Sequence, residues 1–317
     1  MPNKQNIRKI ESFVGRQLGN WILRKKLGQG GMAMVYEADH AFLRNTSAAI
    51  KILHPELSDD HKKLERFRQE AQSINELQHQ NIIKLLDFGH DKQSECHFMV
   101  QELLEGNDLE SEIERCPLPK SEILQIAEQL CSGLDATHRS GLIHRDLKPS
   151  NIFLLPAQSP YPLVKILDFG IAKLHEHQFG DTIPGFPRKE ASSHFHYKDT
   201  TPDCGKKPTK KKGLTEESII LGTPTHLSPE QALNHKELTP SVDIYAFGVI
   251  LYELFSGHLP FSEESIVDQV IAIVQRPAPL IREFRPELAD TTVEAFLARI
   301  LSKRPEDRPA SMLEAWE

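Results

Sequence analysis

The chain has 317 residues and a formal net charge of −7 at pH 7. Its length fits one large or two medium domains, and its 39% hydrophobic and 26% charged residues are typical of a soluble globular protein. The acidic balance argues against a nucleic-acid partner or a membrane surface. The four cysteines form no CxxC pair, which argues against a zinc site or a disulfide framework and favours reduced thiols in the cytoplasm.

The sequence contains no predicted membrane segment. Residues 1–20 form a polar leader that lacks the apolar core of a signal peptide. The longest apolar run, 246–255, is about half the length needed to cross a bilayer. The helical pattern at 311–317 ends abruptly, so we expect the natural protein to continue, with a membrane anchor beyond residue 317 as one option.

The chain reads as a β-rich front and an α-rich back. The predicted strands are 20–28, 34–40, 47–53, 81–89 and 97–103. One helix, about 59–78, interrupts them, and the periodicity is helical from Ser121 onward. This order predicts an α+β fold with two lobes, 21–103 and 104–317, and a cleft between them.

Residues 174–214 have no periodicity and are dense in Pro, Gly, Ser, His and Lys. We expect this stretch to be a disordered insert.

A Gly-rich turn, LGQGGMAMVYEA, lies between the first two predicted strands and contains Gly28, Gly30 and Gly31. A dinucleotide-binding turn joins a strand to a helix, so that interpretation does not fit. Because glycine lacks a side chain, the backbone can approach an anion closely, as in a flap over phosphates. A plain hairpin turn is the alternative.

Lys51 lies within the alternating strand AAIKIL and needs an anionic partner if it is buried. In the following helix, Glu70 falls within the apolar stripe, whereas Glu65 and Glu76 fall on the opposite face. The sequence therefore predicts a Lys51–Glu70 ion pair. A surface lysine on an edge strand is the alternative.

Two acidic motifs follow. The segment GLIHRDLKPSNIFLL places Asp146 and Asn151 among polar residues framed by apolar ones, and KILDFG places Asp168 at the end of a strand-like run. Two carboxylates and an amide are oxygen ligands of the kind that Mg²⁺ prefers.

Eight motifs occur in order: GQGGMAMV, AAIK, Glu70 in RFRQEA, HRDLKPSN, DFG, GTPTHLSPE, DIYAFGVILYELFSG and RPEDRP. Over about residues 20–317 the chain resembles the eukaryotic-type protein kinases, and most resembles bacterial serine/threonine kinases. The resemblance implies a bilobal kinase fold, ATP and Mg²⁺ as cofactors with Mn²⁺ as an alternative metal, and transfer of the γ-phosphate to Ser/Thr hydroxyls of protein substrates.

By this resemblance, Asp146 accepts the proton of the substrate hydroxyl and Lys148 contacts the γ-phosphate. Lys51, fixed by Glu70, binds the α- and β-phosphates, while Asn151 and Asp168 hold the metal ions. The residues implied around the adenine are Leu27, Val35, Ala49 and Phe153, with the backbone of the hinge at about Glu102–Leu104.

The resemblance also implies structural roles. His144 and Asp243 brace the catalytic loop, and Glu230 pairs with Arg308. Arg145 belongs to a pocket for a phosphorylated activation loop. Within that loop, Thr215 and Ser218 are the best acceptors for autophosphorylation, for which self-association in trans is a hypothesis.

Two alternatives remain open. A pseudokinase or scaffold module would share the fold, but the complete set of catalytic residues argues against it. A small-molecule phosphotransferase of related fold usually lacks the GTPxxxSPE and RPEDRP motifs, both of which are present.

Overall fold

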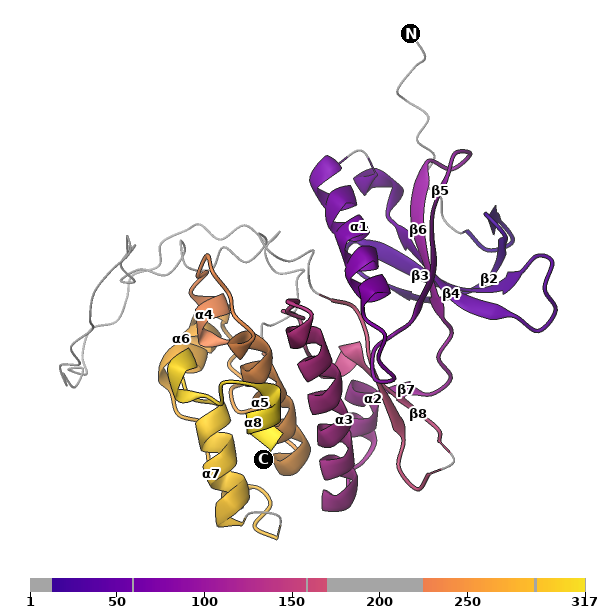
Figure 1. The fold of residues 1–317 in the computed structure, drawn as a ribbon. Helices are drawn as coiled ribbons and strands as arrows, with labels where there is room; N and C mark the ends of the chain where they lie inside the picture. The colour runs from indigo at the N-terminus through magenta and orange to yellow at the C-terminus, as the bar shows by residue number, and fades with distance from the viewer. Residues whose placement is uncertain (1–12, 59, 158, 170–224, 288–289, 317) are drawn as a thin grey trace.

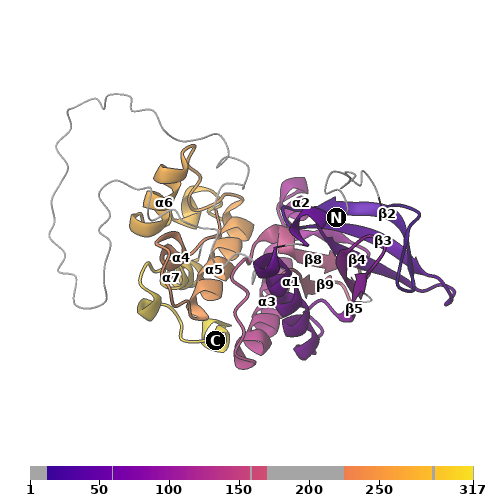
Figure 2. The same ribbon diagram turned by 90° about the horizontal axis from the view of Figure 1, so that it is seen from above.

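The computed structural model describes residues 13–58, 60–157, 159–169, 225–287 and 290–316. A lobe built around a β-sheet and a helical lobe follow one another along the chain (Figure 1). Seen from above, the strands of the large sheet and helices α4 to α7 lie on opposite sides of the molecule (Figure 2). The predictions for the 174–214 insert, Thr215 and Ser218 lie outside the described residues.

The N-lobe consists of a six-stranded antiparallel sheet and one long helix. Its elements are β1 (Gln17–Leu18), β2 (Trp21–Gln29), β3 (Ala33–His40), β4 (Ser47–Leu53), η1 (Pro55–Leu57), α1 (His61–Glu76), β5 (Leu85–Asp91) and β6 (Cys96–Glu102). The strand order is β1-β2-β3-β4-β6-β5. Asp60 caps α1 by accepting from the backbone N–H groups of Lys62 and Lys63.

Strand β4 shows how the sequence positions Lys51. Ala48, Ile50 and Ile52 are fully buried in one hydrophobic cluster, while Ala49 and Lys51 point to the other face and stay partly accessible. This confirms the predicted alternation, which aims Lys51 away from the aliphatic core and toward α1.

Two boundaries differ from the predictions. The leader was predicted to reach residue 20, but Phe13 and Leu18 are 0% and 1% exposed in the N-lobe core and β1 pairs with β2. The predicted strand at 81–89 begins only at Leu85. The residues before it pair with the other lobe instead, since Ile83 N donates to Ile166 O at 3.0 Å.

The C-lobe is mainly helical. Its elements are β7 (Asn107–Asp108), α2 (Leu109–Arg115), α3 (Lys120–Arg139), η2 (Pro149–Asn151), β8 (Ile152–Leu155), β9 (Leu163–Ile166), α4 (Pro229–Ala232), α5 (Ser241–Ser256), α6 (Ile266–Gln275), η5 (Ile281–Glu283), α7 (Thr291–Ile300), η6 (Pro305–Asp307) and α8 (Met312–Trp316). The strands β7, β8 and β9 form a small sheet. The strand-like run predicted before Asp168 overlaps β9, whereas β7 and β8 were not predicted.

The longest apolar run, 246–255, lies in α5, which is buried along almost its whole length. Helix α3 approaches β9 closely at Gly133, where an added Cβ would lie 2.8 Å from Ile166 Cδ1. The predicted pair is also present, since Arg308 Nη1 and Nη2 donate to Glu230 Oε1 and Oε2 at 2.7 and 2.9 Å. Within the described residues, no helix is both long and apolar enough to cross a bilayer.

Candidate active site

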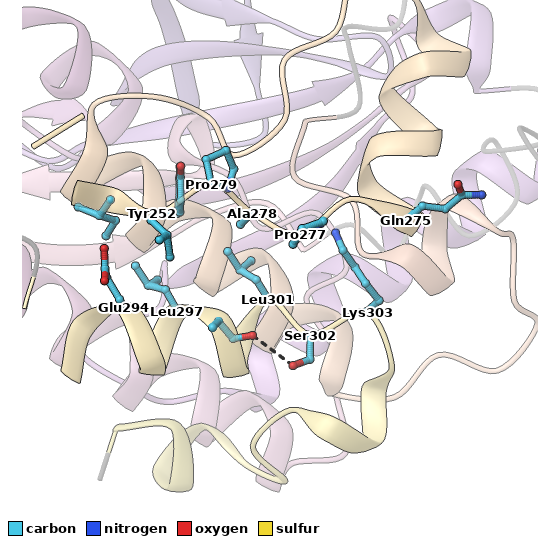
Figure 3. Close-up of a pocket in the computed structure, with 13 residues that line it drawn as sticks. Tyr252, Gln275, Pro277, Ala278, Pro279, Glu294, Leu297, Leu301, Ser302 and Lys303 are labelled. Carbon is cyan, nitrogen blue, oxygen red and sulfur yellow. Dashed lines mark hydrogen bonds between the residues drawn. The ribbon is translucent and has the colours of Figure 1, made fainter. Parts of the chain in front are cut away.

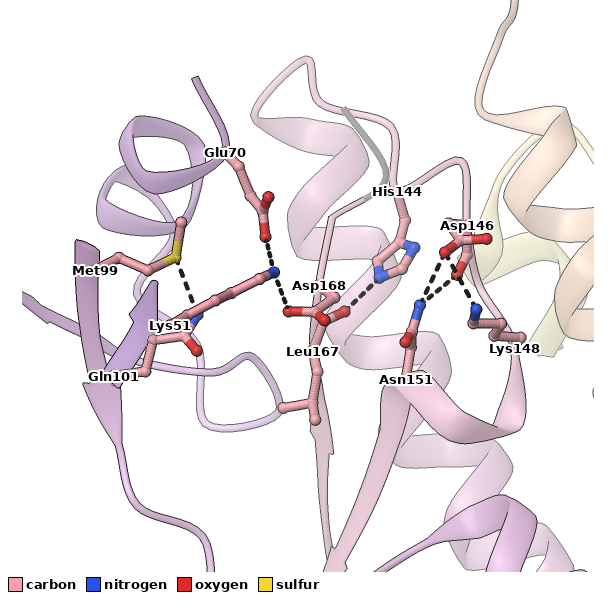
Figure 4. Close-up of polar contacts among 10 residues, drawn as sticks. All are labelled: Lys51, Glu70, Met99, Gln101, His144, Asp146, Lys148, Asn151, Leu167 and Asp168. Atoms are coloured by element: carbon pink, nitrogen blue, oxygen red, sulfur yellow. Dashed lines mark hydrogen bonds and ion pairs between the residues drawn. The ribbon is translucent and has the colours of Figure 1, made fainter. Parts of the chain in front are cut away.

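Lys51 connects three elements of the site. Its Nζ donates to Glu70 Oε1 of α1 at 2.7 Å and to Asp168 Oδ1, just beyond β9, at 2.7 Å (Figure 4). The side chains of Lys51 and Glu70 are 12% and 6% exposed, whereas that of Asp168 is 46% exposed. The predicted Lys51–Glu70 pair is therefore confirmed. The edge-strand alternative is wrong, because β4 lies inside the sheet between β3 and β6.

The charge of Lys51 follows from its surroundings. Burial by itself lowers the pKa of Lys51, but the carboxylates of Asp168 and Glu70 outweigh burial and raise the pKa above its ordinary value. Lys51 is consequently a fixed cation, and within the described residues no hydrogen bond engages the second carboxylate oxygen of Asp168.

Asp243 supports the loop that carries Asp146. It lies in the first turn of α5 and is 1% exposed. Asp243 Oδ2 accepts from His144 N and lies 2.8 Å from His138 Nε2, while Oδ1 accepts from Arg145 N at 2.8 Å. His144 Nε2 lies 2.8 Å from Leu167 O. These contacts hold Arg145 at a φ of 67°, a sparsely populated conformation for a residue with a side chain. The bracing roles predicted for His144 and Asp243 fit this geometry.

Three polar residues gather along the loop. Asn151 Nδ2 donates to the backbone oxygen of Asp146 at 2.8 Å and to Asp146 Oδ2 at 3.2 Å. Lys148 Nζ lies 3.6 Å from the same carboxylate oxygen (Figure 4). The short helix η2, which begins at Pro149, turns Asn151 back toward the loop.

The donor set suits a hard divalent cation. Because Nδ2 of Asn151 is engaged by Asp146, the amide oxygen is turned away and is available as a ligand. Leu167 N donates to Asn151 O at 2.8 Å, which keeps Asp168 beside Asn151. Among the described residues, no group of three or more His, Cys, Asp and Glu side chains gathers as a metal site. The candidate ligands predicted from the sequence are oxygens of Asp168 and Asn151, the atom type that Mg²⁺ prefers.

The residues predicted around the adenine come from both lobes, since Leu27, Val35 and Ala49 lie on strands β2, β3 and β4 and Phe153 lies on β8. Val35 is directly opposite Lys51 across β3 and β4, so Val35, Ala49 and Lys51 share one face. Val35, Ala49 and Phe153 are partly exposed, and Leu27 is 45% exposed. Such partly accessible apolar side chains are suited to contact a flat ring.

The side chain of Glu102 fixes the hinge by hydrogen bonds to neighbouring residues. Glu102 N donates to Lys84 O at 3.0 Å, and Glu102 Oε1 accepts from Lys84 N at 2.8 Å and from Lys165 Nζ at 2.6 Å. Oε1 of Glu102 is thus engaged within the protein, and the contacts from Glu102 and Leu104 to an adenine remain a prediction for their backbone groups. Sequence reasoning did not identify Lys165, which reads as an ordinary strand residue.

Phe169 ties the end of β9 to α1. It is 2% exposed in a cluster with Ile74 of α1 and Ile82, and its ring lies 4.9 Å from that of His144. Asp168 itself has a φ of 42°. Apolar packing of Phe169 on one side and the Lys51 contact on the other therefore fix the position of Asp168.

A separate cavity of about 260 Å³ lies in the C-lobe between α5, α7 and the connection after α6 (Figure 3). None of its lining residues belongs to the predicted site.

Comparison with known proteins agrees with this geometry. The family model described as "Protein kinase domain" matches residues 21–188 and 205–316. The chain is 33% identical over 302 residues to the serine/threonine-protein kinase Pkn1 of Myxococcus xanthus, covering 95% of this chain and 38% of that protein. It is 31% identical over 295 residues to the serine/threonine-protein kinase PrkC of Bacillus subtilis, covering 92% of this chain and 39% of that protein.

Among solved structures, the kinase domain of Mycobacterium tuberculosis PknI matches with a TM-score of 0.65 over 95% of each chain, at 22% sequence identity. That likeness supports the bilobal fold. The chain spans well under half the length of the two curated relatives.

Proposed function

Because the chain belongs to the protein kinase family, we propose that it is a serine/threonine protein kinase that transfers the γ-phosphate of ATP to Ser/Thr hydroxyls of protein substrates. One observation carries the proposal: Lys51 contacts both Glu70 and Asp168, while Asp146, Lys148 and Asn151 gather on the adjacent loop. A binding module has no need of all six polar groups in these positions.

In the proposed reaction, Asp146 orients the substrate hydroxyl and accepts its proton as the oxygen attacks the γ-phosphorus. Lys148, close to Asp146, stabilises the charge that develops on the transferred phosphoryl group. The cationic Lys51 binds the α- and β-phosphates, and Glu70 fixes its position. The loop stays in register because Asp243 holds the N–H groups of His144 and Arg145.

Asn151 and Asp168 would hold Mg²⁺, or Mn²⁺ in its place. The bound cation neutralises phosphate charge and fixes the orientation of the triphosphate. The chain supports this arrangement by leaving the Asn151 amide oxygen and one oxygen of the half-exposed Asp168 available. The adenine would lie between Leu27, Val35, Ala49 and Phe153.

We also propose that the kinase acts in the cytoplasm and that it autophosphorylates in trans at Thr215 or Ser218, which requires two copies to meet. The guanidinium Nε of Arg145 supports the second part, since it is buried without a hydrogen-bond acceptor in the described part of the chain. A phosphate on the activation segment would supply that acceptor.

The test is transfer of label from γ-labelled ATP to the chain itself and to a general protein substrate, for wild type and for Asp146→Asn. Asparagine has nearly the same shape as aspartate but accepts no proton, so transfer is expected to fall by about 10²–10⁴-fold with unchanged thermal stability. A wild-type chain that binds ATP but transfers no label would instead favour the pseudokinase alternative.

A further inference from the structure

The Gly-rich turn between β2 and β3 is not held by side-chain packing of its glycines. A Cβ added to Gly28 or Gly31 would meet nothing within 4 Å, and one added to Gly30 would meet only Ala33 O, at 3.9 Å. Gly30 and Gly31 are exposed. The position of this flap must therefore be set by hydrogen bonds and by residues outside the glycines.

His54 supplies two of those hydrogen bonds. Its ring Nε2 lies 2.9 Å from Gly30 O, which requires the hydrogen on Nε2, and its backbone N donates to Met32 O at 2.9 Å. Both carbonyls on the two sides of Gly31 are thereby fixed by one residue. His54 directly follows β4, three positions after Lys51.

The hydrogen bonds also show which N–H groups of the turn are used within it. Gly30 N donates to Ala33 O at 2.8 Å and is used within the turn. The N–H groups of Gly31 and Met32 donate to no acceptor in the described part of the chain. Backbone N–H groups of this kind bind phosphate oxygens. Met32 adds an apolar anchor, since its side chain packs against the cluster that contains Leu53 and Phe67.

We propose that His54 is a positioning residue for the nucleotide, which latches the flap so that the N–H groups of Gly31 and Met32 meet the phosphates of ATP. This inference rests on the proposed function of the site. It predicts that His54 affects binding of the phosphate part of the nucleotide and leaves binding of the nucleoside part unchanged.

The experiment measures dissociation constants of ATP, ADP and adenosine by calorimetry in the full chain. His54→Phe keeps a ring and the backbone N–H but removes the side-chain donor, whereas His54→Gln restores a donor of similar reach. His54→Phe is expected to raise the dissociation constants of ATP and ADP by about two- to tenfold, the ratio that corresponds to one neutral hydrogen bond. Adenosine should be unaffected, and His54→Gln should recover most of the loss.

The matched control is His61→Phe, which alters an exposed histidine at the start of α1. The proposal would be overturned if His54→Phe weakened the binding of adenosine as much as that of ATP and ADP. Unchanged affinity for ATP and ADP would overturn it as well. Binding is measured without catalysis, so a chain that binds ATP in this pattern but transfers no phosphate would refute the proposed function and leave the role of His54 standing. In an active chain, KM for ATP should rise in His54→Phe while kcat changes by less than about twofold.

Discussion

Lys51 Nζ and Asp168 Oδ1 lie 2.7 Å apart, although 117 residues separate them in the sequence. The contact joins the N-lobe sheet to the end of β9. Asp168 is also the residue proposed to hold the metal ion, so Lys51 fixes a proposed metal ligand and is itself proposed to bind the phosphates. The arrangement explains why α1, β4 and β9 must all be in place before the site can work.

Replacing Lys51 by Met should abolish most of the activity without unfolding the chain. Loss of one preorganised electrostatic contact of this kind lowers kcat by about 10²–10³-fold, and here the change also leaves two carboxylates without their shared cation. Initial rates of phosphate transfer and a thermal melt measure the two effects. The control is Lys120→Met, which removes an exposed ion pair with Asp290 and should leave the rate unchanged. A Lys51→Met rate within threefold of wild type would contradict the assignment.

The local part of this site could be predicted from the sequence. Alternation in AAIKIL and the helical stripe around Glu70 are short-range patterns, and together they gave the Lys51–Glu70 pair. The contact between Lys51 and Asp168 has no short-range pattern, because it depends on how the two lobes meet. The same reason applies to the contact between Lys165 and Glu102, because the sequence alone does not distinguish a buried strand lysine from an exposed one.

The boundaries were predicted less well than the elements. Phe13 and Leu18 lie in a stretch that is polar on average, and two apolar residues without periodicity gave no indication of a strand at the edge of the sheet. The small sheet of β7, β8 and β9 was only partly predicted, because its strands are two to four residues long. The strand-like run before Asp168 indicated β9, and nothing in the sequence indicated β7 or β8.

Asp243→Asn should impair both stability and catalysis. In the wild type, the Asp243 carboxylate accepts hydrogen bonds from His144 N and Arg145 N. In the variant, the NH₂ group of asparagine would face one of these N–H groups, so that two donors would meet. Asparagine keeps one acceptor oxygen, so one hydrogen bond to the buried charge is lost, at a cost of about 1.5–3 kcal/mol in unfolding free energy. Urea denaturation gives that value, and kcat should fall because Arg145 and the loop behind it lose their support. Unchanged kcat in a destabilised variant would show that the brace is not needed for catalysis.

Glu230→Ala should destabilise the C-lobe by about 3–5 kcal/mol, because it leaves the buried guanidinium of Arg308 without its carboxylate. The Arg308 side chain is 0% exposed and also donates to Ser241 O and Ser302 O, so it cannot turn to solvent for compensation. The midpoint of urea unfolding measures the change. Glu306→Ala removes an exposed ion pair with Arg304 and serves as the control. Equal midpoints for Glu230→Ala and Glu306→Ala would disprove the structural role of the pair.

Lys303 gives the protein a predictable pH dependence. Its Nζ donates to Ile273 O at 2.7 Å, lies 4.1 Å from the centre of the Phe261 ring and borders the C-lobe cavity, as Figure 3 shows. Burial, with a smaller effect from the charge of Arg308, lowers the pKa of Lys303 from 10.5 to about 7. Between pH 7 and 10.5 the unfolded chain therefore binds more protons at Lys303 than the folded chain does, so the contribution of this residue to stability increases as the pH rises through that window.

The comparison is wild type against Lys303→Met, with urea midpoints measured at several pH values from 7 to 10. Methionine fills similar space without an ionisable group, so the stability of wild type relative to the variant should increase steadily with pH. Other groups that titrate in this range contribute equally to both proteins and cancel in the difference. A flat or falling difference for Lys303→Met would mean that the folded chain keeps Lys303 protonated and that the ammonium is better solvated than its burial implies.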